Sequence, residues 1–186
     1  MMTEINLKLK NDLFISEKLF SEGKYEDSIK KYQEILIDFP KLVSAINNMG
    51  QSYERLNQLD ESIECFKKCL LIEPNTLTAI NNIVVIYVNK KNYGNAIVYA
   101  TNSLIIDSSQ INMVEIKTKC LIKLDLIVEA SLFLHPHLLK HPNNDTLNAI
   151  YGKILLALNQ HEEGLKALKK GAGFIEFDED KIRIVN

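Results

Sequence analysis

The sequence predicts an all-α solenoid of five helix-turn-helix units, and three observations support this prediction. Residues 9–178 divide into five segments of 34 residues that align without an insertion. Within the segments, apolar residues recur at intervals of three and four, which is the spacing of one helical face. Proline, which cannot continue a helix, follows the second helix in three segments, at Pro40, Pro74 and Pro142.

One column of this alignment holds small residues in all five segments, a second holds them in four of the five, with Val84 as the exception, and a third holds large residues. Position 8 reads Ser16, Gly50, Val84, Thr118 and Gly152, and position 20 reads Ser28, Ser62, Ala96, Ala130 and Gly164. Position 11 is always large, as Leu19, Tyr53, Tyr87, Leu121 and Leu155. Small residues let two helix backbones approach and large ones fill the neighbouring groove, so the columns predict paired helices that pack on each other.

The units follow one another along the chain in a fixed order. After an N-terminal extension at 1–8, they are expected at 9–42, 43–76, 77–110, 111–144 and 145–173. Turn-forming residues separate the two helices of a unit, at Glu22-Gly23-Lys24, Asn57-Gln58, Lys90-Lys91-Asn92 and Asn159-Gln160. The fourth unit departs most from the pattern, because Pro136 lies inside its second helix. That proline predicts a kink, or a helix that restarts at residue 136.

The last unit and the tail complete the predicted elements. Two glycines in Gly171-Ala172-Gly173 predict the end of the last helix. Residues 174–186 alternate apolar and polar residues on either side of an acidic turn, which predicts a strand-like tail, either a β-hairpin or an extended segment. Because an isolated hairpin is marginally stable in water, we expect this tail to lie against the fifth unit or a neighbouring subunit.

The 34-residue pattern of a small residue, a large one, a second small one and a closing proline resembles the tetratricopeptide repeat (TPR) family. The segment from Asn47 to Pro74 is the closest copy of that pattern. The resemblance implies a right-handed superhelix in which the first helix of each unit lines a concave groove. In this family the groove receives a peptide or a helix of a partner protein.

Composition excludes several classes of protein. Lys plus Arg is 22 and Asp plus Glu is 24, so a net charge of −2 gives no reason to expect a nucleic-acid or membrane partner. The N-terminus lacks the pattern of a secretory signal, and we expect a cytoplasmic protein. Phosphate-binding loops, zinc-protease motifs and nucleophile elbows are missing from the sequence, so we expect no enzyme and no cofactor.

Two clusters of metal-ligating residue types have simpler interpretations. His135, His137 and His141 could in principle converge on zinc, but they lack a carboxylate or thiolate partner, and His137 falls in a packing column. Cys65 and Cys69 lie one helical turn apart, and Cys69 falls in the same column. We expect the three cysteines to be free thiols and no metal to be bound.

The candidate binding residues follow from the groove that the resemblance implies. Positions 5 and 6 repeat an Asn-Asn pair in two adjacent units, and stacked amides could hydrogen-bond a peptide backbone or the next helix. Steps of four residues add others to the same face. The predicted groove consists of Asn47, Asn48, Gln51, Arg55, Asn81, Asn82, Val85, Asn89 and Lys119.

Capture of a heat-shock chaperone's C-terminal carboxylate is not expected. Family members that bind it use Lys and Asn in one first helix, Asn in the next, and Lys and Arg in the third. The matching positions in this chain are Leu13, Glu17, Asn48, Thr78 and Asn82, of which only Asn48 fits. A carboxylate requires cationic donors, and these positions hold none.

The function predicted from the sequence is that of a scaffold or adaptor that binds a protein or peptide in its groove. One alternative is a regulatory part of a catalytic system, with the enzyme in trans or in a further C-terminal domain. Another is a structural module that self-associates through the ends of its array, because uncapped repeats invite stacking.

Overall fold

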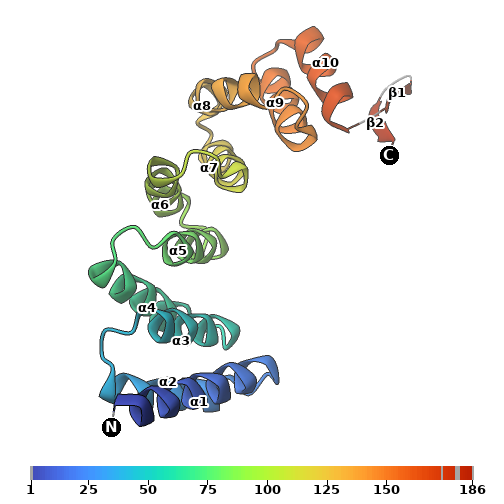
Figure 1. Ribbon diagram of the computed structural model, residues 1–186. Helices are drawn as coiled ribbons and strands as arrows, with labels where there is room; N and C mark the ends of the chain where they lie inside the picture. The colour runs from blue at the N-terminus through green and yellow to red at the C-terminus, as the bar shows by residue number, and fades with distance from the viewer. Residues whose placement is uncertain (1, 173, 179–180, 186) are drawn as a thin grey trace. The chain divides into compact units, whose positions relative to one another are not determined.

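The computed structural model describes residues 2–172, 174–178 and 181–185, and the chain forms two compact units (Figure 1). Unit 1, Met1–Lys90, contains α1 (Met2–Ser21), α2 (Tyr25–Asp38), α3 (Val43–Arg55), α4 (Leu59–Ile72) and α5 (Leu77–Asn89). Unit 2, Lys91–Asn186, contains α6 (Tyr93–Ile106), α7 (Ile111–Lys123), α8 (Ile127–Lys140), α9 (Asp145–Ala157), α10 (His161–Ala172), β1 (Phe174–Asp178) and β2 (Lys181–Val185). The predicted all-α repeat fold with a hairpin tail is confirmed.

Helix boundaries follow the 34-residue period of the sequence. Helices α3, α5, α7 and α9 begin at residues 43, 77, 111 and 145, and α2, α4, α6, α8 and α10 begin at 25, 59, 93, 127 and 161. Helix α1 begins at Met2, so residues 2–8, set apart above as an extension, continue the first helix towards the N-terminus.

Each pair of helices is joined through one residue in the left-handed region. The φ angle is +77° at Gly23 and between +56° and +61° at Asn57, Lys91, Asp125 and Asn159, all at position 15 of the repeat. In four of these turns the next residue donates its backbone N–H to the carbonyl at position 11, for example Gln58 to Tyr53 at 2.9 Å. This bond satisfies a carbonyl that the helix end would leave free.

The small columns lie where the paired helices meet. The Ser62 hydroxyl of α4 donates to the Gly50 carbonyl of α3 at 2.7 Å, and the Ser28 hydroxyl donates to the Ser16 carbonyl at 3.0 Å. A Cβ added at Gly152 would stand 2.8 Å from the Gly164 carbonyl oxygen, so this pair also meets backbone to backbone. The predicted packing role of positions 8 and 20 is confirmed in these three pairs.

Position 27 shows how residue size affects the approach of the helices. Gly171 lies so close to α9 that an added Cβ would collide with the backbone atoms of Asp145 and Ala149. At the same position, the Cys69 thiol lies 3.6 Å from the Val43 carbonyl oxygen. Ile35, the branched residue at this position in α2, lines an open hollow between α1 and α2. Gly171 therefore lies within α10 and packs on α9, and the helix ends one residue later, at Ala172.

Helix α8 runs through Pro136 without the predicted restart, so that alternative is wrong. Proline at 136 deprives the carbonyl of Leu132 of its helical partner. Both Leu132 and Pro136 are exposed, which gives that carbonyl access to water, while buried Leu134 packs into the core between them.

The C-terminal tail forms an antiparallel hairpin, in which Ile175 pairs with Ile184 and Phe177 with Ile182. The predicted acidic turn at 179–180 lies outside the described residues, and so do residues 173 and 186. Among the described residues, no helix combines the length and apolar character needed to cross a membrane.

Candidate functional site

Helices α1, α3 and α5 are the first helices of the repeats in unit 1, and most of the predicted groove residues lie on α3 and α5. Helix α3 contacts α1 on one side and α5 on the other. Four of the predicted residues belong to α3 and four to α5, while Lys119 belongs to α7 in unit 2. The structure therefore brings eight of the nine to two neighbouring helices: Asn47, Asn48, Gln51 and Arg55 on α3, and Asn81, Asn82, Val85 and Asn89 on α5.

Two hollows on this surface meet at Asn48. One, of about 220 Å³, lies between α1, α2 and α3 and is lined by Glu17, Phe20, Tyr32, Asn48 and Gln51. The other, of about 500 Å³, lies at the N-terminal ends of α3 and α5, and its lining includes Asn47, Asn48, Glu73, Thr76 and Thr78. Sequence reasoning did not include Glu17 among the groove residues, although it occupies the same repeat position as Gln51 and Val85.

The asparagines of α3 are held by side-chain hydrogen bonds, but not completely. Asn48 hydrogen-bonds the Tyr32 phenol of α2, and Asn47 Nδ2 donates to Asn48 Oδ1 at 3.4 Å. Burial raises the pKa of Tyr32, and the bond to Asn48 acts in the opposite direction. Asn48 is therefore partly structural, as one of the two interpretations of the amides predicted.

Two buried amide atoms on this surface lack a hydrogen-bond partner within the described residues: Asn47 Oδ1 and Asn82 Nδ2. One is an acceptor on α3 and the other a donor on α5. A buried polar atom without a partner costs about 1–3 kcal/mol, so both amides have a hydrogen-bonding capacity that the folded chain does not use.

The repeat explains why Asn82 differs from Asn48. The two asparagines occupy the same position in successive units, and the residue equivalent to Tyr32 is Phe66, which is fully buried and has no hydroxyl. Helix α4 packs on α5 as α2 packs on α3. Asn82 therefore has the surroundings of Asn48 without its phenol.

Adding a phenol at residue 66, next to Asn82, is expected to raise the stability of unit 1. Replacing Phe66 with tyrosine should provide Asn82 with a partner and raise the free energy of unfolding by about 0.5–1.5 kcal/mol, the usual gain from one hydrogen bond. Urea unfolding would measure the change. The same substitution in an Asn82→Ala background should give no gain, and an equal gain there would show that the hydroxyl bonds another group.

The other predicted groove residues differ in exposure. Arg55 and Asn89 are exposed at the last residues of α3 and α5, Val85 is 38% exposed, and Asn81 is half-buried. Lys119 is exposed on α7 and lies 3.4 Å from the Glu115 carboxylate. Asn47, Asn48 and Gln51 thus line the hollows, and Arg55 and Asn89 lie at their helix ends.

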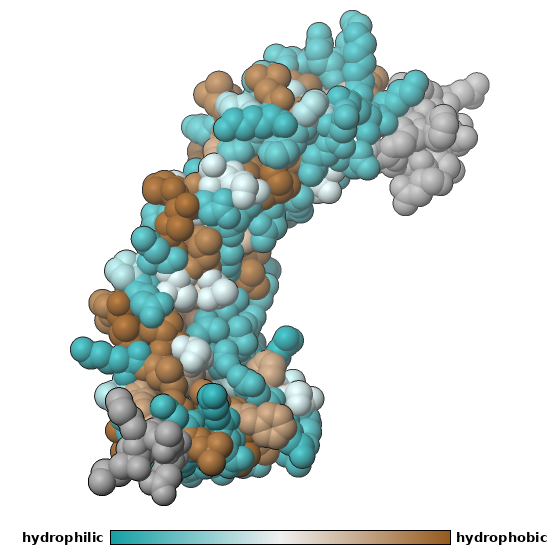
Figure 2. All heavy atoms as spheres, viewed as in Figure 1, coloured by the Kyte–Doolittle hydropathy of each residue, from teal (hydrophilic) through white to brown (hydrophobic). Residues whose placement is uncertain are grey.

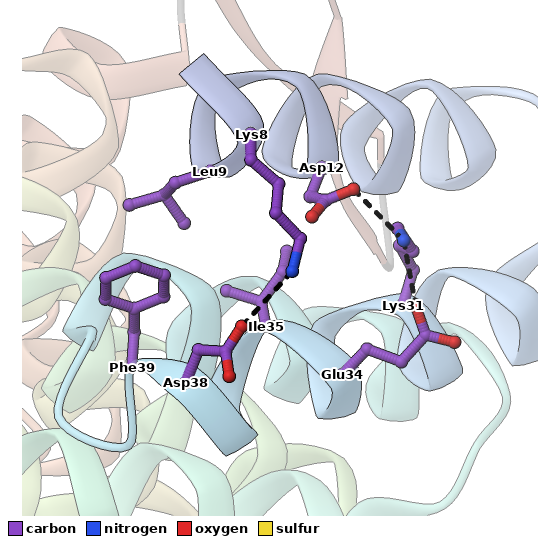
Figure 3. A pocket seen from close by; sticks show the side chains of 8 residues that line it. All are labelled: Lys8, Leu9, Asp12, Lys31, Glu34, Ile35, Asp38 and Phe39. Atoms are coloured by element: carbon purple, nitrogen blue, oxygen red, sulfur yellow. Dashed lines mark hydrogen bonds and ion pairs between the residues drawn. The ribbon is translucent and has the colours of Figure 1, made fainter. Parts of the chain in front are cut away.

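A further hollow, of about 520 Å³, opens between α1 and α2, and its charged groups pair with one another (Figure 3). The Lys8 ammonium reaches the Asp38 carboxylate at 3.4 Å, and Lys31 bridges Asp12 at 3.1 Å and Glu34 at 2.8 Å. These two carboxylates raise the pKa of Lys31. Because two lysines pair with three carboxylates, the hollow keeps only one net negative charge with which to select a ligand.

The histidines and cysteines have partners or surroundings that do not favour metal or redox chemistry. His135 hydrogen-bonds the Tyr151 hydroxyl at 3.0 Å, whereas the ring of His137 lies 5.0 Å from that of Phe133. No group of three or more potential metal ligands occurs among the described residues. Burial raises the pKa of Cys65 and of Cys69 to about 11, so both remain thiols rather than reactive thiolates at neutral pH.

Protonation of His137 is expected to weaken unit 2. Burial lowers its pKa below 6.5, and the nearby charges of Lys140, His141 and Lys117 lower it further. His137 therefore binds a proton more readily in the unfolded chain than in the folded chain. The free energy of unfolding is highest above about pH 6.5, and it falls as the pH drops from there towards the lower pKa of His137 in the folded chain. The melting temperature should decrease between pH 7.5 and 5.5, and His137→Gln should reduce that decrease more than His161→Gln, a change at an exposed residue.

Comparison with known proteins adds a family match and a fold. A family model of the tetratricopeptide repeat matches residues 43–76, which are the second predicted unit. No curated protein matches the chain. A solved structure titled crystal structure of MamA protein aligns with a TM-score of 0.77 at 15% identity, over 88% of this chain and 89% of that one. MamA residues 41 to the end from Desulfovibrio magneticus RS-1 align with a TM-score of 0.76 at 14% identity, over 88% and 93%. At these identities the likeness is one of fold.

Proposed function

We propose that unit 1 binds an extended peptide of a partner protein across α3 and α5, because the family model of the tetratricopeptide repeat matches residues 43–76 within this unit. Its repeat and its fold are those of protein-interaction scaffolds. The observation that carries the proposal is the pair of unsatisfied amide atoms, the acceptor Asn47 Oδ1 and the donor Asn82 Nδ2. A peptide backbone offers one donor and one acceptor per residue, and a small rotation of each amide would present these atoms to it.

The hollows beside Asn48 supply the rest of this surface. Thr76, Thr78 and Gln51 contribute neutral polar groups, and Phe20 contributes an aromatic side chain. Glu17 and Glu73 add negative charge, and Lys41 adds one positive charge. Neutral amides and hydroxyls recognise backbone rather than a charged terminus, so we expect tolerance of side-chain sequence and a preference for extended segments.

Replacing the two amides should separate binding from stability. A library of displayed 12-residue peptides would first be selected against the whole protein. We expect Asn47→Ala and Asn82→Ala together to weaken the selected peptides by roughly tenfold, at about 1.4 kcal/mol per factor of ten. The melting temperature should change little, because each change removes an unsatisfied buried atom and the hydrogen bond that is lost, from Asn47 to Asn48, is long at 3.4 Å.

Two further variants make that result interpretable. Asn143→Ala alters an exposed amide in the loop between α8 and α9 and should leave peptide affinity unchanged. Asn48→Ala breaks the bond to Tyr32 and should lower stability by about 1 kcal/mol. Unchanged affinity in the Asn47 and Asn82 double variant, with a lower melting temperature, would show that these amides hold the helices and do not contact a partner.

A further inference from the structure

Aliphatic side chains recur on the exposed side of the second helices, away from the groove described above. Position 29 of the repeat is an almost fully exposed aliphatic residue in four successive units: Ile37 at 80%, Leu71 at 84%, Ile105 at 76% and Leu139 at 68% exposure. Single exposed aliphatic residues need no explanation, but repetition at one position of a 34-residue period does.

In unit 2 these residues belong to longer apolar stripes. Val98 and Ile105 lie seven residues apart on α6, and Val128, Leu132 and Leu139 lie at spacings of four and seven on α8, all at least 55% exposed. Such spacings place side chains along one side of a helix. Figure 2 shows apolar side chains gathered over α6 and α8.

Unit 1 provides an internal comparison, because the same positions there are charged. Val98 and Leu132 occupy position 22, where α2 has Lys30 and α4 has Glu64. Helix α6 contains no Asp, Glu, Lys or Arg, and α8 contains only Glu129 and Lys140, near its two ends. Lys30 and Glu64 therefore interrupt the stripes in α2 and α4, whereas Asn102 and His135 lie between the aliphatic residues of α6 and α8.

We propose that the exposed faces of α6 and α8 form a second docking surface, which takes the aliphatic face of an amphipathic helix from a partner protein. A stripe without Asp, Glu, Lys or Arg between its aliphatic residues matches an apolar occupant, because a charged group placed against it would be desolvated without a partner. Side chains spaced at four and seven residues form a ridge that can pack into the grooves of another helix. Helices α6 and α8 have 14 residues each and are about 21 Å long, which is enough to contact four turns of that helix. Helix α6 lacks the cations that attract anionic lipid, which makes a membrane a poorer fit.

A photo-crosslinker placed at this surface tests the proposal in the native cell. Benzoyl-phenylalanine would replace Ile105 in the full chain, and Ile37 in a matched control with the same exposure but a lysine at position 22. After irradiation, mass spectrometry would identify the crosslinked segment. We expect a segment of another protein with aliphatic residues spaced three, four and seven apart, captured at position 105 and much less at position 37.

Charged substitutions complete the test. Val98→Glu and Leu132→Glu copy the glutamate that α4 carries at the same position, and because both sites are exposed, the melting temperature should hardly change. The yield at position 105 should fall roughly tenfold in this double variant. Crosslinks to a second copy of this chain, to lipid or to a segment without helical spacing would each overturn the proposal. The proposal would also be wrong if the crosslinking yields at positions 105 and 37 were equal, if the yield at position 105 did not fall in the double glutamate variant, or if no protein were crosslinked.

Discussion

Replacing Gly171 with alanine is expected to destabilise the chain strongly, although alanine is the better helix former. The added Cβ would collide with the backbone nitrogen of Ala149 and the carbonyl oxygen of Asp145 in α9. Backbone atoms cannot move aside by changing rotamer, so α10 must separate from α9 or the last turn must unfold. We expect a loss of about 2–4 kcal/mol, which outweighs the gain of about 1 kcal/mol from helix propensity.

Gly94 offers a matched control within a helix. It lies in the first turn of α6, and an added Cβ there would meet no atom within 4 Å. Gly94→Ala should therefore raise the free energy of unfolding by up to about 1 kcal/mol. Guanidinium unfolding of both variants, with hydrogen exchange of the α10 amides, would measure the contrast. If alanine at 171 stabilised the protein as alanine at 94 is expected to do, α10 and α9 would not be in close contact.

The fold was predictable from the sequence because each helix pair uses the same few positions. Small residues at position 8, such as Gly50 and Gly152, allow the paired backbones to approach, and the left-handed residue at position 15 reverses the chain. A period without insertions lets every unit support the assignment of the others. Gly171 was interpreted as a helix terminator because glycine serves both purposes, and only the position of α9 shows that it packs.

The sequence predicted that most of the candidate groove residues would lie on the first helices of adjacent repeats, but it did not predict their hydrogen bonds. The repeat placed Asn48 and Asn82 on equivalent faces, yet their difference depends on Tyr32 and Phe66, which come from a neighbouring helix. The exposed aliphatic residues were missed for a related reason. Leu70 and Leu71 are adjacent apolar residues at a helix end, and sequence alone does not show which of the two packs and which faces solvent.

Gly50→Leu is expected to overfill the contact between α3 and α4. A Cβ at residue 50 would already stand 2.9 Å from Phe66 Cε1 and 3.1 Å from Cys65 Cβ, and leucine adds three more carbon atoms in the same direction. Phe66 is fully buried, so a ring displaced by leucine must press on other core side chains or expose apolar surface. Such overpacking costs about 1–3 kcal/mol or more, so the urea midpoint should fall clearly.

A rescue and a control decide whether the loss comes from this contact. Replacing Phe66 with leucine should cost stability in the native background but recover part of the loss in the Gly50→Leu background, because the two residues compete for one space. Lys67→Leu adds leucine to the same helix at a half-buried position paired with Glu64 at 3.1 Å, and it should change stability by about 0.5 kcal/mol or less. Equal losses for Gly50→Leu and Lys67→Leu would mean that position 8 does not face the paired helix. If Gly50→Leu lowers the free energy of unfolding and Phe66→Leu relieves part of that loss, the small residue at position 50 sets the distance between α3 and α4.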